Sequence, residues 1–235
     1  MLLKNKSAVI TGASDGIGKQ IALKLAREGV RLALIGRDES KLQAVEKETK
    51  KLGTPKVRIY PCDISKTDNL KKTIKSITSD FENINILLNV AGIWQKVNPL
   101  EKIDETTVDN VIQTNLIALI HCTRLLLPYL KKSEEAVIIN ISSKSGVVAQ
   151  QGQSVYTASK YGVTGFTEVL KVDLKDTNIR VAGVYQAGTN TKMFEKSGDN
   201  FPVQKFTNPA DLADVIVFML SRPKKIWLHE VRVQY

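Results

Sequence analysis

The sequence contains little cysteine and little histidine. Two cysteines, Cys62 and Cys122, lie inside apolar segments, and two histidines, His121 and His229, stand far apart in the chain. A disulfide framework requires paired cysteines in a small secreted chain, and a structural zinc site requires thiolate and imidazole ligands at close spacing. Neither pattern occurs here, so we expect no disulfide framework and no metal site.

Long apolar runs are also missing. No stretch approaches the roughly 18 to 20 consecutive apolar residues that a membrane-spanning helix needs. The first residues, Met1 to Lys6, are too few and too quickly charged for a signal peptide. We therefore expect a cytoplasmic protein without a membrane partner.

Acidic residues are fewer than basic ones, with 24 Asp and Glu against 34 Lys and Arg, and the net charge is +10. Such an excess can indicate nucleic-acid binding. Here the lysines alternate with acids along amphipathic segments such as residues 41–51 and 66–75, which indicates solvated helix faces. With no nucleic-acid motif present, we expect no such partner, although a polyanionic cofactor or an acidic carrier would suit the charge.

Strand and helix patterns alternate along the chain, and its 235 residues suit one domain, residues 1–235. Continuous apolar strands between amphipathic helices predict an α/β, Rossmann-like doubly wound fold, with a seven-stranded, mostly parallel sheet and helices on both faces. The expected strands are residues 6–11, 31–36, 56–61, 85–89, 135–141, 179–186 and 226–233. The expected helices are residues 16–28, 39–52, 66–81, 105–131, 154–175 and 209–221.

A glycine-rich turn, residues 11–18, follows the first strand and opens the first helix. Glycines let the backbone turn tightly and approach a pyrophosphate, which the amino end of the helix then holds. The alternative is a tight strand-to-helix connection without a ligand. The residues expected at a dinucleotide are Gly12, Ser14, Asp15, Gly16, Ile17 and Gly18.

The end of the second strand indicates which dinucleotide fits. An acidic residue there binds the adenosine ribose hydroxyls, and a basic one pairs with a 2′-phosphate. This chain has Gly36 followed by Arg37, so the sequence favours NADP(H) over NAD(H). Asp38 offers an alternative, because it could hold Arg37 in a surface ion pair.

Tyr156 and Lys160 stand four residues apart in the expected helix 154–175, on one face and one turn apart. An unperturbed phenol has a pKa of about 10, and an adjacent ammonium lowers the pKa, which makes a tuned proton donor or acceptor. Ser143 follows an apolar strand, at the edge where open α/β sheets build their sites. The alternative is two unrelated polar residues on a solvated helix face.

Ser143, Tyr156 and Lys160 at this spacing resemble the catalytic set of the short-chain dehydrogenase/reductase family, of its conventional NADP-preferring type. The glycine-rich turn is similar to the family's Gly-x-x-x-Gly-x-Gly variant. The resemblance implies that Asn115 holds a water against Lys160. It also implies cofactor contacts by Asp63 and Ile64 at the adenine, and by Asn89, Ala91 and Gly92 in an Asn-x-Ala-Gly signature. Asp63 has a compatible alternative role at a helix start.

Residues 184–193 align with the family's Val-x-Pro-Gly-x-Val-x-Thr-x-Met, which implies that Thr189 and Thr191 contact the nicotinamide end. Gln186 and Ala187 replace the Pro-Gly pair. A positive φ costs alanine more energy than glycine. We therefore expect either a different shape of the chain beside the nicotinamide, or a one-residue slip that puts Gly188 where the family has its glycine.

The expected substrate contacts are Trp94, Tyr185, Gln186 and Phe194, with Gln95 beside Trp94 at the rim of the site. An oligomer interface is an equal alternative for Trp94. The short insert, residues 194–207, suggests an open pocket. The last strand lacks the glycine-rich ending of the ketoacyl reductase branch, which weakens a ketoacyl carrier as substrate.

The resemblance implies an NADP(H)-dependent oxidoreductase that interconverts a small-molecule ketone or aldehyde and an alcohol by hydride transfer. Tyr156 would be the general acid or base, aided by Lys160, Ser143 and Asn115. The alternative is a non-catalytic dinucleotide-binding regulator on the same fold, although such proteins usually lose one of these four residues. The family also implies a homo-oligomer, a tetramer or dimer formed through its long helices.

Overall fold

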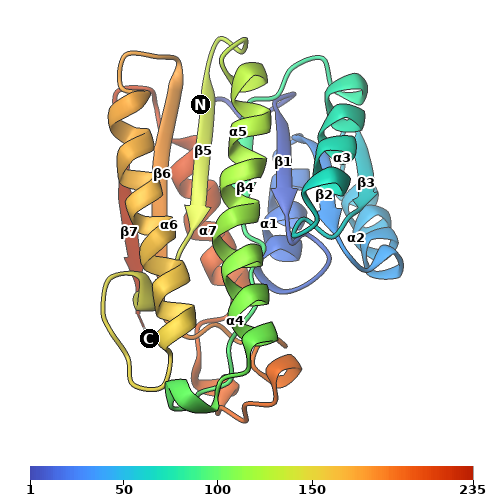
Figure 1. The fold of residues 1–235 in the computed structure, drawn as a ribbon. Coiled ribbons are helices and arrows are strands. Elements are labelled where there is room, and N and C mark those ends of the chain that lie inside the picture. Colours follow the sequence, from blue (N-terminus) through green and yellow to red (C-terminus); the bar gives the residue numbers. More distant parts are fainter. Residues whose placement is uncertain (235) are drawn as a thin grey trace.

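A computed structural model describes residues 1–234, and its seven strands form one sheet in the order β3-β2-β1-β4-β5-β6-β7 (Figure 1). All neighbouring strands pair in parallel, which confirms the Rossmann-like doubly wound fold. The sheet was expected to be mostly parallel and is entirely parallel. The strands are β1 (Ser7–Thr11), β2 (Arg31–Gly36), β3 (Val57–Pro61), β4 (Ile86–Asn89), β5 (Ala136–Ile141), β6 (Ile179–Gln186) and β7 (Glu230–Val233).

Helices cover both faces of the sheet (Figure 1). One face carries α1 (Gly16–Arg27), α2 (Glu39–Lys51) and α7 (Pro209–Ser221), and the other carries α3 (Thr67–Asp80), α4 (Glu105–Ile112), α5 (Ala118–Leu130) and α6 (Ser154–Asp173). Successive strand residues point to opposite faces, so Val9 packs in one hydrophobic cluster and Ile10 in the other. Every residue of β1, β4 and β5 is buried, which explains their continuous apolar sequences.

The expected helix 105–131 contains a π-helical turn, Gln113–Ile117, between α4 and α5. The stretch Glu105–Leu130 is long and apolar enough for a membrane span by length and composition alone. Its buried residues, among them Ala118, Cys122 and Leu126, pack against the sheet, which accounts for that hydropathy.

The last strand is shorter than residues 226–233. The Ile226 amide donates to the Pro223 carbonyl, which closes a turn, and the Trp227 indole donates to the Val181 carbonyl. Ile226 and Trp227 are therefore held by a turn and a side chain, and the backbone pairing with β6 begins where the Gly183 amide donates to the His229 carbonyl.

Strand order reverses between β1 and β4, which lie side by side although β2, β3 and three helices separate them in sequence. Crossovers leave this point in opposite directions, so the loops after β1 and β4 diverge and open a crevice at the carboxyl ends of the strands. Residues 187–208, orange in Figure 1, lie beneath the same ends of the sheet.

Candidate active site

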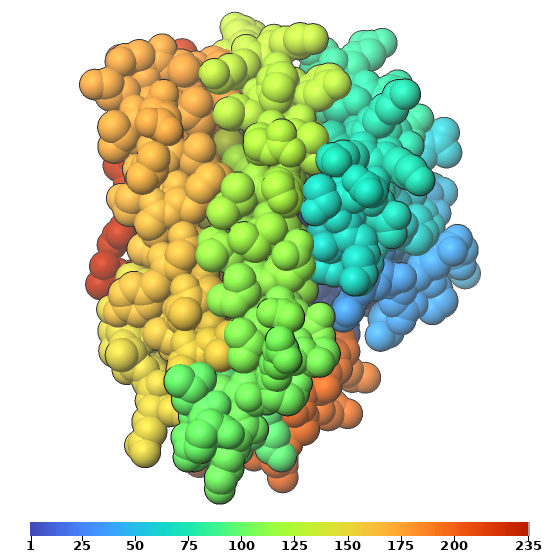
Figure 2. All heavy atoms as spheres, viewed as in Figure 1, coloured from blue at the N-terminus to red at the C-terminus, as the bar shows by residue number. Residues whose placement is uncertain are grey.

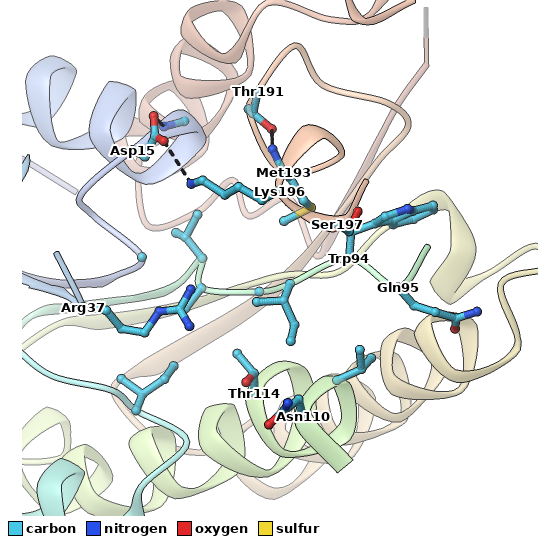
Figure 3. Close-up of a pocket in the computed structure, with 18 of the residues that line it drawn as sticks. Asp15, Arg37, Trp94, Gln95, Asn110, Thr114, Thr191, Met193, Lys196 and Ser197 are labelled. Atoms are coloured by element: carbon cyan, nitrogen blue, oxygen red, sulfur yellow. Dashed lines mark hydrogen bonds and ion pairs between the residues drawn. The ribbon is translucent and has the colours of Figure 1, made fainter. Parts of the chain in front are cut away.

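A cavity of about 590 Å³ fills the crevice between the loops that follow β1, β2, β3 and β4 (Figure 3). Most of the residues that the sequence places at a dinucleotide line this cavity. They are Gly12, Ser14, Asp15, Gly16, Ile17, Gly18, Arg37, Asp63, Ile64, Ala91, Gly92 and Thr191.

Close backbone packing explains the glycines of the first turn. Gly12 has a φ of 68°, and a Cβ there would lie 2.8 Å from the Cα of Ala91. A Cβ at Gly18 would lie 2.2 Å from the carbonyl oxygen of Gly12. Only glycine lets the turn approach β4 and begin α1 here, and that approach brings the amino end of α1 to the cavity.

Asp15 caps α1, accepting a hydrogen bond from the Gly16 amide at 2.8 Å. Across the cavity, the Lys196 ammonium lies 3.2 Å from the same carboxylate (Figure 3). Burial raises the pKa of Asp15, but the Gly16 amide and Lys196 together outweigh burial and hold the pKa below its ordinary value. Asp15 and Lys196 therefore link the glycine-rich turn to the segment beneath the sheet.

Arg37 extends its guanidinium into the cavity (Figure 3). Asp38 does not hold it, because that carboxylate caps α2 at the Lys41 amide, accepts from the Ser40 hydroxyl and pairs with the Lys41 ammonium. Within residues 1–234, Arg37 has no hydrogen bond or ion pair. A cation that lines a cavity without a partner is suited to an anionic ligand.

Asp63 and Asn89 differ in where they point. Asp63 lines the cavity and also accepts hydrogen bonds from the amide and hydroxyl of Ser65, so a ligand role and a turn-capping role coexist. Asn89 lies outside the cavity, and its amide donates to the side chains of Thr123 on α5 and Asn140 on β5. Its side chain joins two strands and a helix, and a cofactor contact by Asn89 stays a prediction.

The structure brings Ser143, Tyr156, Lys160 and Asn115 together beside the cavity, all of them buried. The Ser143 hydroxyl lies close enough to the Tyr156 phenol to act on the phenol pKa. The Lys160 ammonium lies 5.7 Å from the centre of the Tyr156 ring and donates to the Ile141 carbonyl at 3.0 Å.

Asn115 sits in the π-helical turn and is fully buried. Its side chain accepts from the Ile93 amide at 2.8 Å and donates to the Ile93 carbonyl and the Ser159 hydroxyl. A Cβ at Gly92 would lie 3.3 Å from the side-chain oxygen of Asn115 and 3.6 Å from the Lys160 ammonium. Asn115 thus fixes the loop after β4 against the helix that carries Lys160, and π turns are frequent at such sites.

Burial sets the protonation of Tyr156 and Lys160. It raises the pKa of Tyr156 to about 12, although the Ser143 hydroxyl acts in the opposite direction. It lowers the pKa of Lys160 to about 8. The pKa of Tyr156 is therefore raised and not lowered as expected, because desolvation by burial is the largest influence on it.

An aromatic lid covers Tyr156. We define the lid as Trp94 with Phe194, Phe201 and Phe206. The Trp94 ring centre lies 4.5 Å from that of Tyr156 and 5.0 Å from that of Phe194, and the three phenylalanines pack edge to face or tilted on one another. Tyr156 is consequently only 4 % exposed.

The Asp199 carboxylate holds the lid to the loop after β4. It accepts from the Trp94 indole at 2.6 Å and from the Val97 amide at 3.1 Å. The short insert therefore does not leave the pocket open, because its aromatic residues reach across to Trp94. Trp94 lines the cavity and Phe194 packs on it in the lid, and a substrate contact by either residue stays a prediction.

Tyr185, Gln186 and Thr189 do not line the cavity. Tyr185 is buried, which raises the pKa of its phenol, and a Cβ at Gly183 would lie 2.7 Å from its hydroxyl oxygen. The Thr189 hydroxyl donates to the Ala187 carbonyl. Neither Ala187 nor Gly188 has a positive φ, so the substitution of the family's Pro-Gly pair causes no backbone strain.

Gln95 lines the cavity next to Trp94, and its side chain is also bonded to the start of α6. Its amide is 1 % exposed, donates to the Gly152 carbonyl and accepts from the amides of Val155 and Tyr156 at the start of α6. Lys196, Asp199 and this role of Gln95 were not apparent in the sequence, because each depends on a partner far away along the chain.

Similarity to known proteins agrees with this geometry. The profile of the short chain dehydrogenase family matches residues 6–201. The chain belongs to this family. This short chain dehydrogenase is 32% identical over 235 residues to an uncharacterised oxidoreductase of Staphylococcus epidermidis, a match that covers 99% of this chain and 98% of that protein.

Two further members of the family are similar to this dehydrogenase over nearly the whole chain. The 3-oxoacyl-acyl-carrier-protein reductase FabG of Staphylococcus epidermidis is 34% identical over 230 residues, which cover 94% of this dehydrogenase and 93% of the reductase. A solved metagenomic short-chain oxidoreductase in complex with NADP is 30% identical, with a TM-score of 0.86 and coverage of 100% of both chains. The protein described here is thus an oxidoreductase of a family that uses nicotinamide cofactors.

Proposed function

We propose that this short chain dehydrogenase is an NADP(H)-dependent oxidoreductase that interconverts a ketone or aldehyde and an alcohol. The observation that carries the proposal is the buried Tyr156 phenol beside Ser143, with the Lys160 ammonium on the next turn of α6 and 5.7 Å from the centre of the Tyr156 ring. A phenol there would serve as the proton donor, with a second hydroxyl beside it. A non-catalytic regulator would need none of these groups in this arrangement.

The residues around the cavity fit a phosphorylated dinucleotide. Gly12 and Gly18 let the glycine-rich turn pack closely on neighbouring backbone, which brings the amino end of α1 to the cavity, and that end favours an anionic diphosphate. Arg37, free of Asp38, suits a 2′-phosphate, which favours NADP(H). Asp63 and Ile64 would hold the adenine, and Thr191 would hold the nicotinamide end.

When bound, the nicotinamide supplies or accepts the hydride. In the reductive direction, Tyr156 gives its phenol proton to the carbonyl oxygen as the carbonyl carbon gains the hydride, so the product is a neutral alcohol. Ser143 donates a hydrogen bond to the developing alkoxide. Lys160 stabilises the resulting phenolate by its charge, and Asn115 keeps the loop after β4 in place.

The aromatic lid favours substrates with an apolar body, because the surface next to Tyr156 is made of aromatic rings. A carbonyl can reach Tyr156 only when the lid moves. The FabG relative makes 3-oxoacyl thioesters one candidate class, to be compared with aromatic and aliphatic ketones. We also propose a cytoplasmic location and a homo-oligomeric assembly.

Cofactor choice can be tested by titrating NADPH and NADH separately and following energy transfer from tryptophan to nicotinamide. We expect NADPH to bind more tightly. Arg37→Ala should weaken NADPH binding about 10-fold to 100-fold, the usual cost of losing hydrogen bonds to a charged group, while NADH binding changes little. Lys47→Ala removes an exposed charge from α2 and serves as the matched control. Equal losses for both dinucleotides would contradict a 2′-phosphate contact.

Catalysis can be tested with Tyr156→Phe in a carbonyl screen with NADPH. Removal of the proton donor should lower kcat by about 10²-fold to 10⁴-fold while NADPH binding stays intact. If the wild type reduced no carbonyl and bound neither dinucleotide, calorimetry confirming the absence of binding, the reductase proposal would be wrong.

A further inference from the structure

Helix α6 begins without a cap of its own. The first amides of a helix have no partner within it and are usually satisfied by a side chain at the preceding residue. Gln153, which precedes α6, makes no such bond, and its side-chain oxygen accepts from the Ser145 hydroxyl instead. The first turn of the helix that carries Tyr156 therefore depends on another part of the chain.

Gln95, in the loop after β4, supplies the missing partner. Its side-chain oxygen accepts from the Val155 amide at 3.0 Å and from the Tyr156 amide at 2.9 Å. Its side-chain nitrogen donates to the Gly152 carbonyl at 3.0 Å, just before the helix. One buried amide group thus spans the start of α6, and one of its three bonds is to Tyr156 itself.

The neighbouring side chain holds Tyr156 from a second direction. The Trp94 ring packs on the Tyr156 ring, and Trp94 and Gln95 lie next to each other at one end of the cavity (Figure 3). The same loop is fixed to the π-helical turn through Ile93 and Asn115. The backbone of Tyr156 is therefore tied to a rigid loop that also lines the cavity.

We infer that Gln95 is a positioning residue for proton transfer by Tyr156. It fixes the backbone of Tyr156, so that the phenol stays next to Ser143 beside the cavity. Gln95 itself contacts no reacting atom. The inference rests on the proposed reductase function, and it assigns to Gln95 more than the stabilisation that an ordinary helix cap provides.

Three variants separate positioning from simple capping. Gln95→Met keeps the size of the side chain and removes all three hydrogen bonds. Gln95→Glu keeps the two acceptor bonds, and its charge suits a helix amino end. Asn208→Ala removes an ordinary cap, the bond to the Ala210 amide at the start of α7, far from Tyr156 in sequence and outside the cavity.

Each variant is assayed with NADPH and the carbonyl that the wild type reduces fastest. Gln95→Met should lower kcat about 10-fold to 100-fold, as expected for misplacement of a reacting group, with the KM for NADPH within about twofold. Gln95→Glu should recover most of kcat. Asn208→Ala should lower the melting temperature by about 2–4 °C without changing kcat.

Two results would overturn the inference. If Gln95→Met lowered only the melting temperature, as Asn208→Ala does, Gln95 would be a cap and nothing more. If Gln95→Met raised the KM for NADPH without lowering kcat, the role of Gln95 would be to shape the cofactor site instead. Failure of the proposed function looks different, because the wild type would then reduce no carbonyl, and the positioning role would fall with it.

Discussion

The Lys160 side chain is buried, with Lys160 only 4 % exposed, and its ammonium donates a hydrogen bond to the Ile141 carbonyl. Burial lowers its pKa from 10.5 to about 8. Between these two pH values the unfolded chain binds more protons than the folded protein. The contribution of Lys160 to stability therefore rises with pH across this window and is least favourable below about pH 8.

The sign of this effect gives a prediction for Lys160→Met. The free energy of unfolding of the wild type, measured relative to the variant in urea, should rise by about 2 kcal/mol between about pH 7 and about pH 9.5. Parallel stability curves for the two proteins would show that Lys160 is not desolvated in the folded state.

At the same scale, Tyr156 shows what residue spacing can and cannot predict. The four-residue separation correctly predicted that Tyr156 and Lys160 share one side of α6. It could not predict how deeply they are buried, because burial comes from Trp94 and the segment beneath the sheet. The direction of the Tyr156 pKa shift depends on that burial.

At the scale of elements, the loops that can be predicted are those whose partners are local or whose shape needs glycine. The glycine-rich turn joins β1 to α1 within a few residues, and its spacing is visible in sequence. The strands could be predicted from their continuous apolar residues, except that β7 begins only at Glu230. The bond from Trp94 to Asp199 joins residues 105 positions apart and leaves no pattern along the chain.

The aromatic lid gives the prediction that belongs to this scale. Asp199→Ala removes the acceptor of both the Trp94 indole and the Val97 amide. In a Trp227→Phe background, where Trp94 is the only tryptophan, we expect its emission to shift to the red and acrylamide to quench it more strongly. Asn200→Ala, an exposed neighbour, is the control.

An unchanged Trp94 emission in Asp199→Ala would show that ring packing alone holds the lid. The ion pair between Lys196 and Asp15 then remains as the second link across the cavity. Because both side chains are largely exposed, that pair contributes at most about 1 kcal/mol, and we assign the main closing force to the aromatic contacts and Asp199.

At the scale of the molecule, the two faces of the sheet have different outer surfaces. The helices α5 and α6 lie side by side on the face that Figure 2 presents. Large apolar side chains remain exposed there, Tyr129 on α5 and Tyr161, Val169 and Val172 on α6. Exposed apolar side chains gathered on neighbouring helices mark association sites, and a twofold axis would bring the same patch of two copies together.

We therefore expect a second copy of this dehydrogenase to cover α6. Sedimentation velocity at micromolar concentration should give a dimer or tetramer for the wild type. Val169 is 58 % exposed and Val172 is 65 % exposed. The double variant Val169→Glu, Val172→Glu would bring like charges face to face in the interface, so it should dissociate the protein into smaller assemblies. Its circular dichroism spectrum should be unchanged. Phe218→Glu on α7 alters an equally exposed apolar side chain on the opposite layer. If it dissociated the oligomer and the α6 variant did not, the interface would lie on the α7 side.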